Sequence, residues 1–103
     1  MKRANVYMQN IAAGVLTEHS KNNYTFVYNS DYKNAPISLT MPVKKEIYYY
    51  DKFPPFFEGL LPEGFNLTQL LRLRKIDSND YFSQLMYIGK DVIGAVTIIE
   101  INE

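Results

Sequence analysis

The feature that most constrains the fold is a change of hydrophobic period at Pro54-Pro55. Before this pair, apolar and polar residues alternate, as they do in half-buried β-strands, most clearly over 24–29. After it, apolar residues recur at the spacing of an amphipathic helix, and proline itself fits the first turn of a helix. The sequence therefore predicts an α+β fold, with a small antiparallel or mixed sheet made of an N-terminal meander and a C-terminal strand, and two to three short helices in the second half.

Five strands are expected along the chain. In the first half they cover 5–9, 14–19, 24–29 and 37–41, and the last strand covers 92–101. A turn is predicted at 10–12 and a polar loop at 20–23, and Pro36 and Pro42 bracket the fourth strand, as expected where pairing ends. The segment 43–50 is ambiguous, and one interpretation is an extended run lying over the core.

Three helical segments are expected in the second half. The first is a short turn over 56–61, and the second is opened by Pro62-Glu63 and ends in a basic last turn. The third is capped by Asp77 or Ser78 and ended by Gly89. The predicted buried stripes are Leu67, Leu70 and Leu71 in the second helix and Phe82, Leu85 and Met86 in the third.

Composition excludes several kinds of chemistry. The 103 residues suit one domain, 1–103, and carry 11 basic and 11 acidic side chains, which disfavours a general nucleic-acid binder. No cysteine is present, and one histidine, His19, cannot form a histidine metal cluster alone. No phosphate-binding loop or kinase motif occurs, so we expect no enzyme activity, no cofactor and no metal.

The targeting signals of secreted and membrane proteins are also missing. The N-terminal apolar stretch is interrupted by polar residues, and no run approaches the ~18 apolar residues that a membrane helix needs. A cytoplasmic protein without direct contact to membrane or nucleic acid is the simplest expectation.

Aromatic and charged clusters offer candidates for a binding surface. The nine Tyr and six Phe suit an interface about as well as padding of a small core. Six of them fall within 48–57, where some should stay exposed and mark a contact. Lys44-Lys45 is more simply a solvated face than a phosphate or partner contact. Catalysis by Glu58 and Glu63 is disfavoured, because their spacing fixes no common face.

Three motifs make the sequence similar to a known family. The segment 36–42 resembles the Pro-Leu-Ser-Leu-Ser-Leu-Pro element of HipA N-terminal subdomains, and 56–64 resembles the Phe-Phe-x-Asn-Leu-Leu-Pro-Glu-Gly signature that follows it. Residues 80–82, 88–91 and 94–96 match the Asp-x-Phe, Ile-Gly-x-Asp and Gly-Ala parts of a third pattern. The resemblance covers nearly the whole chain in the expected order. It departs at Gly59, where the family more often has asparagine.

The resemblance implies an antitoxin. In HipA the subdomain continues into a kinase core, whereas this chain stops at Glu103, as HipS does in the tripartite HipB–HipS–HipT toxin–antitoxin systems. There HipS binds and neutralises the serine/threonine kinase HipT, and a HipB-like protein contributes DNA binding to a ternary complex, directly or through the kinase. The alternative is a fragment, or a standalone structural subdomain, of a HipA-like kinase without inhibitory activity.

The predicted partner contact centres on one turn. Phe65 follows a glycine at a helix start and could project as an anchor. The residues expected to bind the kinase are Pro62, Glu63, Gly64, Phe65, Glu58 and Tyr49, within an interface on the order of 800 Å² per partner. For Phe56, Phe57, Leu60 and Leu61, packing in the core is favoured over contact with the partner.

Overall fold

The computed structural model describes residues 1–89 and 95–101, with the side chain of Phe65 left out. Its strands are β1 (Lys2–Met8), β2 (Ile11–Ser20), β3 (Asn23–Tyr28), β4 (Tyr48–Tyr50) and β5 (Val96–Glu100). Its helices are α1 (Pro55–Glu58), α2 (Gly64–Arg74) and α3 (Tyr81–Ile88). The predicted α+β class is confirmed.

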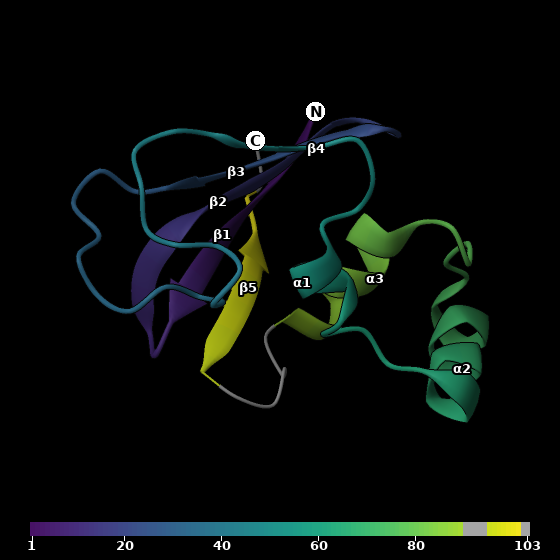
Figure 1. Cartoon of the computed structure of the whole chain (residues 1–103). Helices are drawn as coiled ribbons and strands as arrows, with labels where there is room; N and C mark the ends of the chain where they lie inside the picture. The colour runs from purple at the N-terminus through teal and green to yellow at the C-terminus, as the bar shows by residue number, and fades with distance from the viewer. Residues whose placement is uncertain (90–94, 102–103) are drawn as a thin grey trace.

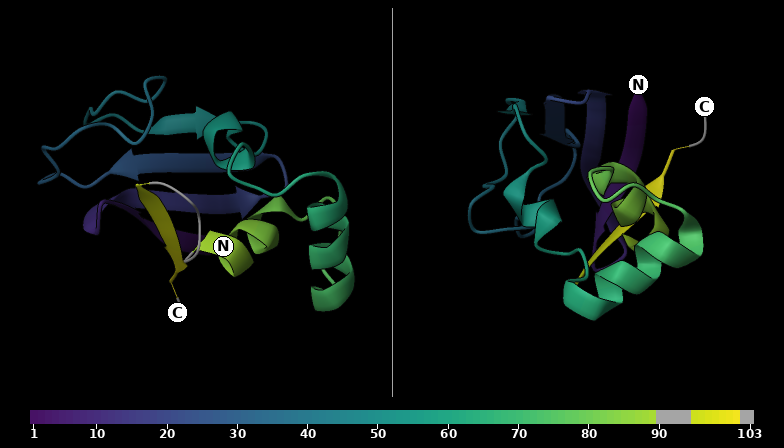
Figure 2. Two further views of the ribbon diagram at one scale, coloured as in Figure 1. Left: turned by 90° about the horizontal axis from the view of Figure 1, so that it is seen from below. Right: turned by 90° about the vertical axis from the view of Figure 1, so that its right-hand side faces the viewer.

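All five strands form one antiparallel sheet in the order β4-β3-β2-β1-β5. The helices gather on one side of this sheet, and α1 and α3 lie against it while α2 stands apart at one end of the molecule (Figures 1 and 2). The last strand crosses back to pair with the first, Val6 lying opposite Ile98. The last strand was predicted over 92–101, and β5 covers only part of that range. Residue 95 lies before β5, and 92–94 fall outside the described residues.

The first hairpin turns earlier than the sequence suggested. Gln9 and Asn10 both have positive φ, at 50° and 68°, which is the pattern of a two-residue type I′ turn whose twist matches the flanking strands. Ile11 and Ala12, predicted to belong to the turn, therefore already lie in β2. β3 forms as predicted, with its three aromatic side chains buried on one face.

The predicted strand at 37–41 is wrong. Ile37 and Met41 are buried, but the Tyr28 hydroxyl holds the chain between them in a turn, accepting from the Ile37 N–H at 3.1 Å and donating to the Met41 carbonyl at 2.5 Å. Ser38 adds a local bond, because its hydroxyl accepts from the Thr40 N–H at 3.2 Å. Such side-chain bonds satisfy backbone groups that a strand would have to pair with a neighbour.

The ambiguous segment 43–50 divides in two. Its last three residues form β4, an edge strand that pairs with Tyr24, Thr25 and Phe26 of β3. Its first part, 43–47, runs outside the sheet and is exposed. A strand of three residues is one of the ways in which proteins keep a sheet edge short.

Two helix starts differ from the prediction. α2 begins at Gly64, with Glu63 as its N-cap, and so later than Pro62. α3 is capped by Asp80 and not by Asp77 or Ser78, because the Asp80 carboxylate accepts from the Ser83 N–H at 3.1 Å and from its hydroxyl at 2.7 Å. The carbonyls of Asp77 and Ser78 instead accept from the buried Gln84 amide. α1 starts at the predicted proline pair, and Gly89 follows the last residue of α3.

The core lies between the sheet and α1 and α3. Its largest fully buried side chains include Leu16 and Phe26 from the sheet, Phe57 from α1, and Phe82 and Leu85 from α3. The predicted stripe of α3 is thus confirmed, with Met86 half-buried beside it. In α2 only Leu70 of the predicted stripe is buried, and Leu67 and Leu71 are half-buried.

The buried tyrosines make the fold sensitive to alkaline pH. Burial raises the pKa of Tyr24 from 10.0 to about 12. The Tyr24 hydroxyl donates a hydrogen bond to the Glu18 carboxylate, with the two oxygens 3.1 Å apart, and this negative charge adds to the shift. The folded state therefore holds this proton more tightly than the unfolded chain does. The free energy of unfolding is expected to be unaffected below about pH 10 and to fall as the pH rises toward about 12.

Urea titrations at a series of alkaline pH values measure this loss. Tyr24→Phe should lose stability less steeply than the unmodified chain, although a slope remains because burial also raises the pKa of Tyr28 and Tyr32. Tyr49→Phe, at an exposed position of β4, is the control. Equal slopes for Tyr24→Phe and the unmodified chain would contradict the prediction.

Candidate functional site

The turn before α2 is shaped by its glycine. Gly64 has φ of +59°, in the left-handed region, and no atom lies within 4 Å of where its Cβ would stand. The backbone conformation, and not lack of space, therefore requires glycine here. Glu63 before it is extended and exposed, and Pro62 is half-buried. The turn thus places Glu63 and Gly64 at the surface, directly before α2.

α2 is anchored at its C-terminal end. The Arg74 guanidinium lies 4.4 Å from the centre of the Tyr87 ring of α3, and Lys75, in the left-handed conformation, donates its N–H to the Leu71 carbonyl. Leu70, although buried, is not part of the main core cluster, and Leu73 is 72% exposed. Since little of α2 faces the core, the turn at its N-terminal end is open to a partner.

The other two predicted contact residues lie elsewhere. Glu58, exposed at the end of α1, lines a hollow of about 430 Å³ with residues of the β2–β3 turn such as Lys21. Tyr49 is 72% exposed and, because its neighbours Tyr48 and Tyr50 pack toward the core, points to the opposite face of the sheet. The structure therefore keeps the four residues 62–65 together, and it places Tyr49 on the face away from the helices.

The apolar residues of the signature segment 56–64 serve the core. Phe57 is fully buried, with its ring centre 5.8 Å from that of Phe26, and Leu61 is 9% exposed. Phe56 and Leu60 are half-buried and pack against this cluster. The preference for core packing at these four positions agrees with their burial, and it leaves the turn at 62–64 as the exposed part of the motif.

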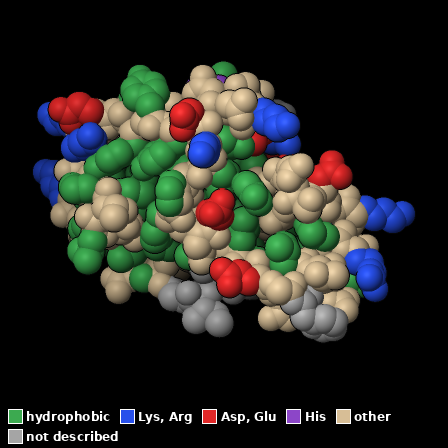
Figure 3. All heavy atoms as spheres, turned by 45° about the vertical axis from the view of Figure 1, so that its right-hand side comes forward, with side chains coloured by type: hydrophobic (Ala, Val, Ile, Leu, Met, Phe, Trp, Pro, Cys, Tyr) green, Lys and Arg blue, Asp and Glu red, His purple; other side chains and the backbone are tan. Residues whose placement is uncertain are grey.

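One exposed residue was missed by the sequence analysis. Leu39 is 94% exposed at the tip of the turn that the Tyr28 hydroxyl holds. A strand over 37–41 would turn Ile37, Leu39 and Met41 to one face, but only Ile37 and Met41 are buried. Figure 3 shows hydrophobic side chains gathered on the face in view, with acidic and basic side chains among them.

Nothing in the described part of the chain forms a metal centre. Across residues 1–89 and 95–101, no group of three or more His, Cys, Asp or Glu side chains is placed to hold an ion. Within the same ranges, none of the helices is long and apolar enough to span a bilayer.

Comparisons with known proteins agree on one relationship. The model of the HipA N-terminal domain family matches residues 4–99. An uncharacterized protein of Haemophilus influenzae is 31% identical over 100 residues, which cover 97% of this chain and 93% of that protein. A solved structure, the N-terminal domain of HipA toxin, superposes with a TM-score of 0.79 at 26% identity and covers 100% of this chain and 95% of that one.

Proposed function

The chain belongs to the HipA N-terminal domain family, and from this membership we propose that it is a HipS-like antitoxin. In this proposal it is not an enzyme. It binds a HipT-like serine/threonine kinase in the cytoplasm and neutralises it. A HipB-like DNA-binding protein joins them in a ternary complex, in contact with this chain directly or through the kinase. A HipA-type kinase is the kind of partner that family membership suggests.

The observation that carries the proposal is the extent of the match to the Haemophilus influenzae protein. The aligned region covers 93% of that relative, so that protein is little longer than the domain itself. A domain that in HipA belongs to a kinase toxin therefore has a relative of roughly its own length. A relative of that length would act on a kinase through an intermolecular interface, and this supports the proposal for the present chain.

The start of α2 is the surface best suited to meet the kinase. The turn at 62–64 is exposed, and its conformation is fixed by a left-handed glycine and by core packing of Phe57 and Leu61 just before it. Pre-ordering of a contact segment lowers the entropy lost on binding. Phe65 follows this turn directly in the chain, and its aromatic side chain is the candidate anchor.

Replacement of Phe65 by alanine is expected to weaken kinase binding by at least about tenfold, which corresponds to about 1.4 kcal/mol. The experiment purifies the chain together with the kinase encoded next to it, measures affinity by calorimetry, and follows kinase autophosphorylation with and without the chain. Rescue of growth on co-expression gives a cellular measurement of the same interaction.

Leu73→Ala is the matched control, because Leu73 is an exposed apolar residue near the other end of α2. It should leave affinity unchanged, and both variants should keep the melting temperature of the unmodified chain. Unchanged binding and neutralisation by Phe65→Ala would refute the anchor. A chain that binds the kinase but leaves its activity intact would refute the antitoxin and support the structural subdomain.

A further inference from the structure

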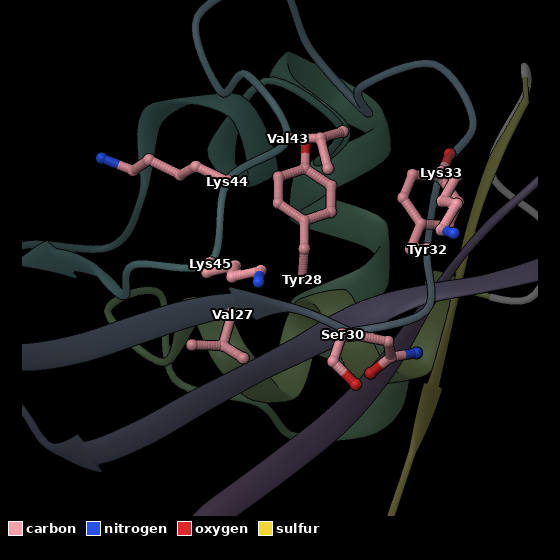
Figure 4. Close-up of a pocket in the computed structure, with 9 residues that line it drawn as sticks. Val27, Tyr28, Ser30, Tyr32, Lys33, Val43, Lys44 and Lys45 are labelled. Carbon is pink, nitrogen blue, oxygen red and sulfur yellow. The ribbon is translucent and has the colours of Figure 1, made fainter.

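A second surface feature lies away from α2. A pocket of about 630 Å³ opens between the end of β3 and the exposed segment 43–45, within the range of roughly 300–1,000 Å³ typical of ligand pockets. In Figure 4, Tyr28 stands between the segment that carries Val43 to Lys45 and the one that carries Tyr32 and Lys33. The loop that carries these residues and α2 lie at opposite ends of the molecule (Figure 1).

The floor of this pocket is apolar and held in place. Tyr28 and Tyr32 stack with ring centres 5.7 Å apart and an interplanar angle of 12°, and both are 4% exposed. Their hydroxyls already donate to the carbonyls of Met41 and Ala35, so the small part of each ring that reaches the pocket is apolar. The floor therefore suits an apolar side chain without rearrangement.

The pocket also borders an incomplete strand edge. The pairing of β4 with β3 ends at the Phe26–Tyr48 pair. The Asn29 N–H donates to the Ala13 carbonyl of β2 and so points toward β2. Backbone groups of successive strand residues point to opposite sides, so the N–H and C=O of Tyr28 point to the β4 side of β3, beyond the end of β4. An extended peptide could continue the row of β4 and pair with Tyr28, as in recognition by strand addition.

The charged groups that line the pocket are lysines. Lys33 and Lys45 flank Tyr28, and among the described residues neither has a carboxylate within ion-pair distance. Lys44 instead lies over the Tyr48 ring, 4.2 Å from its centre. Glu46 is next to Lys45 in the chain but does not line the pocket. The chain is neutral overall, so this positive rim is a local feature.

We propose that this pocket binds an extended acidic peptide segment of a partner protein. One apolar side chain of the peptide fills the floor, its backbone pairs with Tyr28, and flanking Asp or Glu side chains meet Lys33 and Lys45. A nucleotide is a poorer fit, because no glycine lines the pocket to bring backbone N–H groups close to phosphates.

A selection from displayed random peptides about twelve residues long tests the proposal, with the intact chain as bait and Lys33→Glu/Lys45→Glu as counter-selection. Enriched peptides should combine one apolar residue with Asp or Glu nearby. The affinity of the most enriched peptide, measured by fluorescence polarisation, should fall at least about tenfold for Lys33→Glu/Lys45→Glu. It should also fall for Val43→Asp, which places a negative charge at the apolar wall.

Lys21→Glu/Lys52→Glu is the matched control, since it makes the same change of net charge at exposed lysines outside this pocket. It should keep the affinity within about twofold. Selection of peptides without acidic residues, equal binding by the two double variants, or no enrichment would each overturn the proposal. The assay contains no kinase, so its outcome is independent of the antitoxin function.

Discussion

Replacement of Phe26 by alanine is expected to lower the free energy of unfolding by about 3–5 kcal/mol. The Phe26 side chain is fully buried at the centre of the core, with its ring centre 4.9 Å from that of Tyr28 and 5.8 Å from that of Phe57. Its removal loses buried apolar area and leaves a cavity between β3 and α1. Since domains of this size are stable by about 5–15 kcal/mol, this loss takes a large share of the total.

Urea denaturation at neutral pH measures this loss. Tyr49→Ala is the matched control on the neighbouring strand, because Tyr49 is 72% exposed, and it should cost less than about 1 kcal/mol. Similar costs for the two variants would mean that Phe26 is not at the centre of a packed core. In that case the position of α1 over β3 would have to be revised.

Replacement of Gly89 by alanine is expected to destabilise the fold by about 2–3 kcal/mol, at the upper end for overpacked sites. A Cβ at this position would stand 2.4 Å from the Ile98 carbonyl oxygen and 2.9 Å from the Ile98 Cβ. The first of these is backbone of β5, so α3 or the strand must shift. The φ of Gly89 is −58°, a value open to any residue, so the cost arises from the close approach alone.

Gly59 provides a matched control, because it also follows a helix and has φ of −64°. A Cβ there would meet the Phe56 carbonyl at 3.4 Å, an ordinary contact. Gly59→Ala should therefore be neutral or stabilising by about 0.4–1 kcal/mol, through the entropy of the unfolded chain. Thermal melts of both variants compare the two sites. A Gly89→Ala variant as stable as Gly59→Ala would show that α3 and β5 do not approach so closely.

Gly89 also illustrates a correct prediction with a different physical cause. The sequence placed it at the end of a helix, where glycine commonly adopts a left-handed conformation. The helix does end there, but the glycine is right-handed and is needed because β5 passes beside it. The partner that makes glycine necessary, Ile98, belongs to another element, β5, so the pattern at the end of a helix could not reveal it.

Only those parts of the candidate site that depend on neighbouring residues could be predicted from the sequence. The motif at 56–64 predicted both the core packing of Phe57 and Leu61 and the turn that follows them. Glu58 lines a hollow together with the β2–β3 turn, and Tyr49 points away from the helices. Both placements depend on the sheet order, which the sequence did not specify. The pocket beside Tyr28 was missed because Lys33 and Lys45 are brought to it by a loop that a tyrosine hydroxyl holds.

The sequence by itself determined which side chains of β3 face the core, which residues of α3 form its buried stripe, and that α1 starts at a proline. Each of these depends on side-chain period or on a proline next to the element, and both are local properties. Tertiary structure alone decided that 37–41 is a turn and that 48–50 is a strand. Backbone N–H and C=O groups must find partners, and in these two segments the partners, the Tyr28 hydroxyl and the edge of β3, come from elsewhere in the chain.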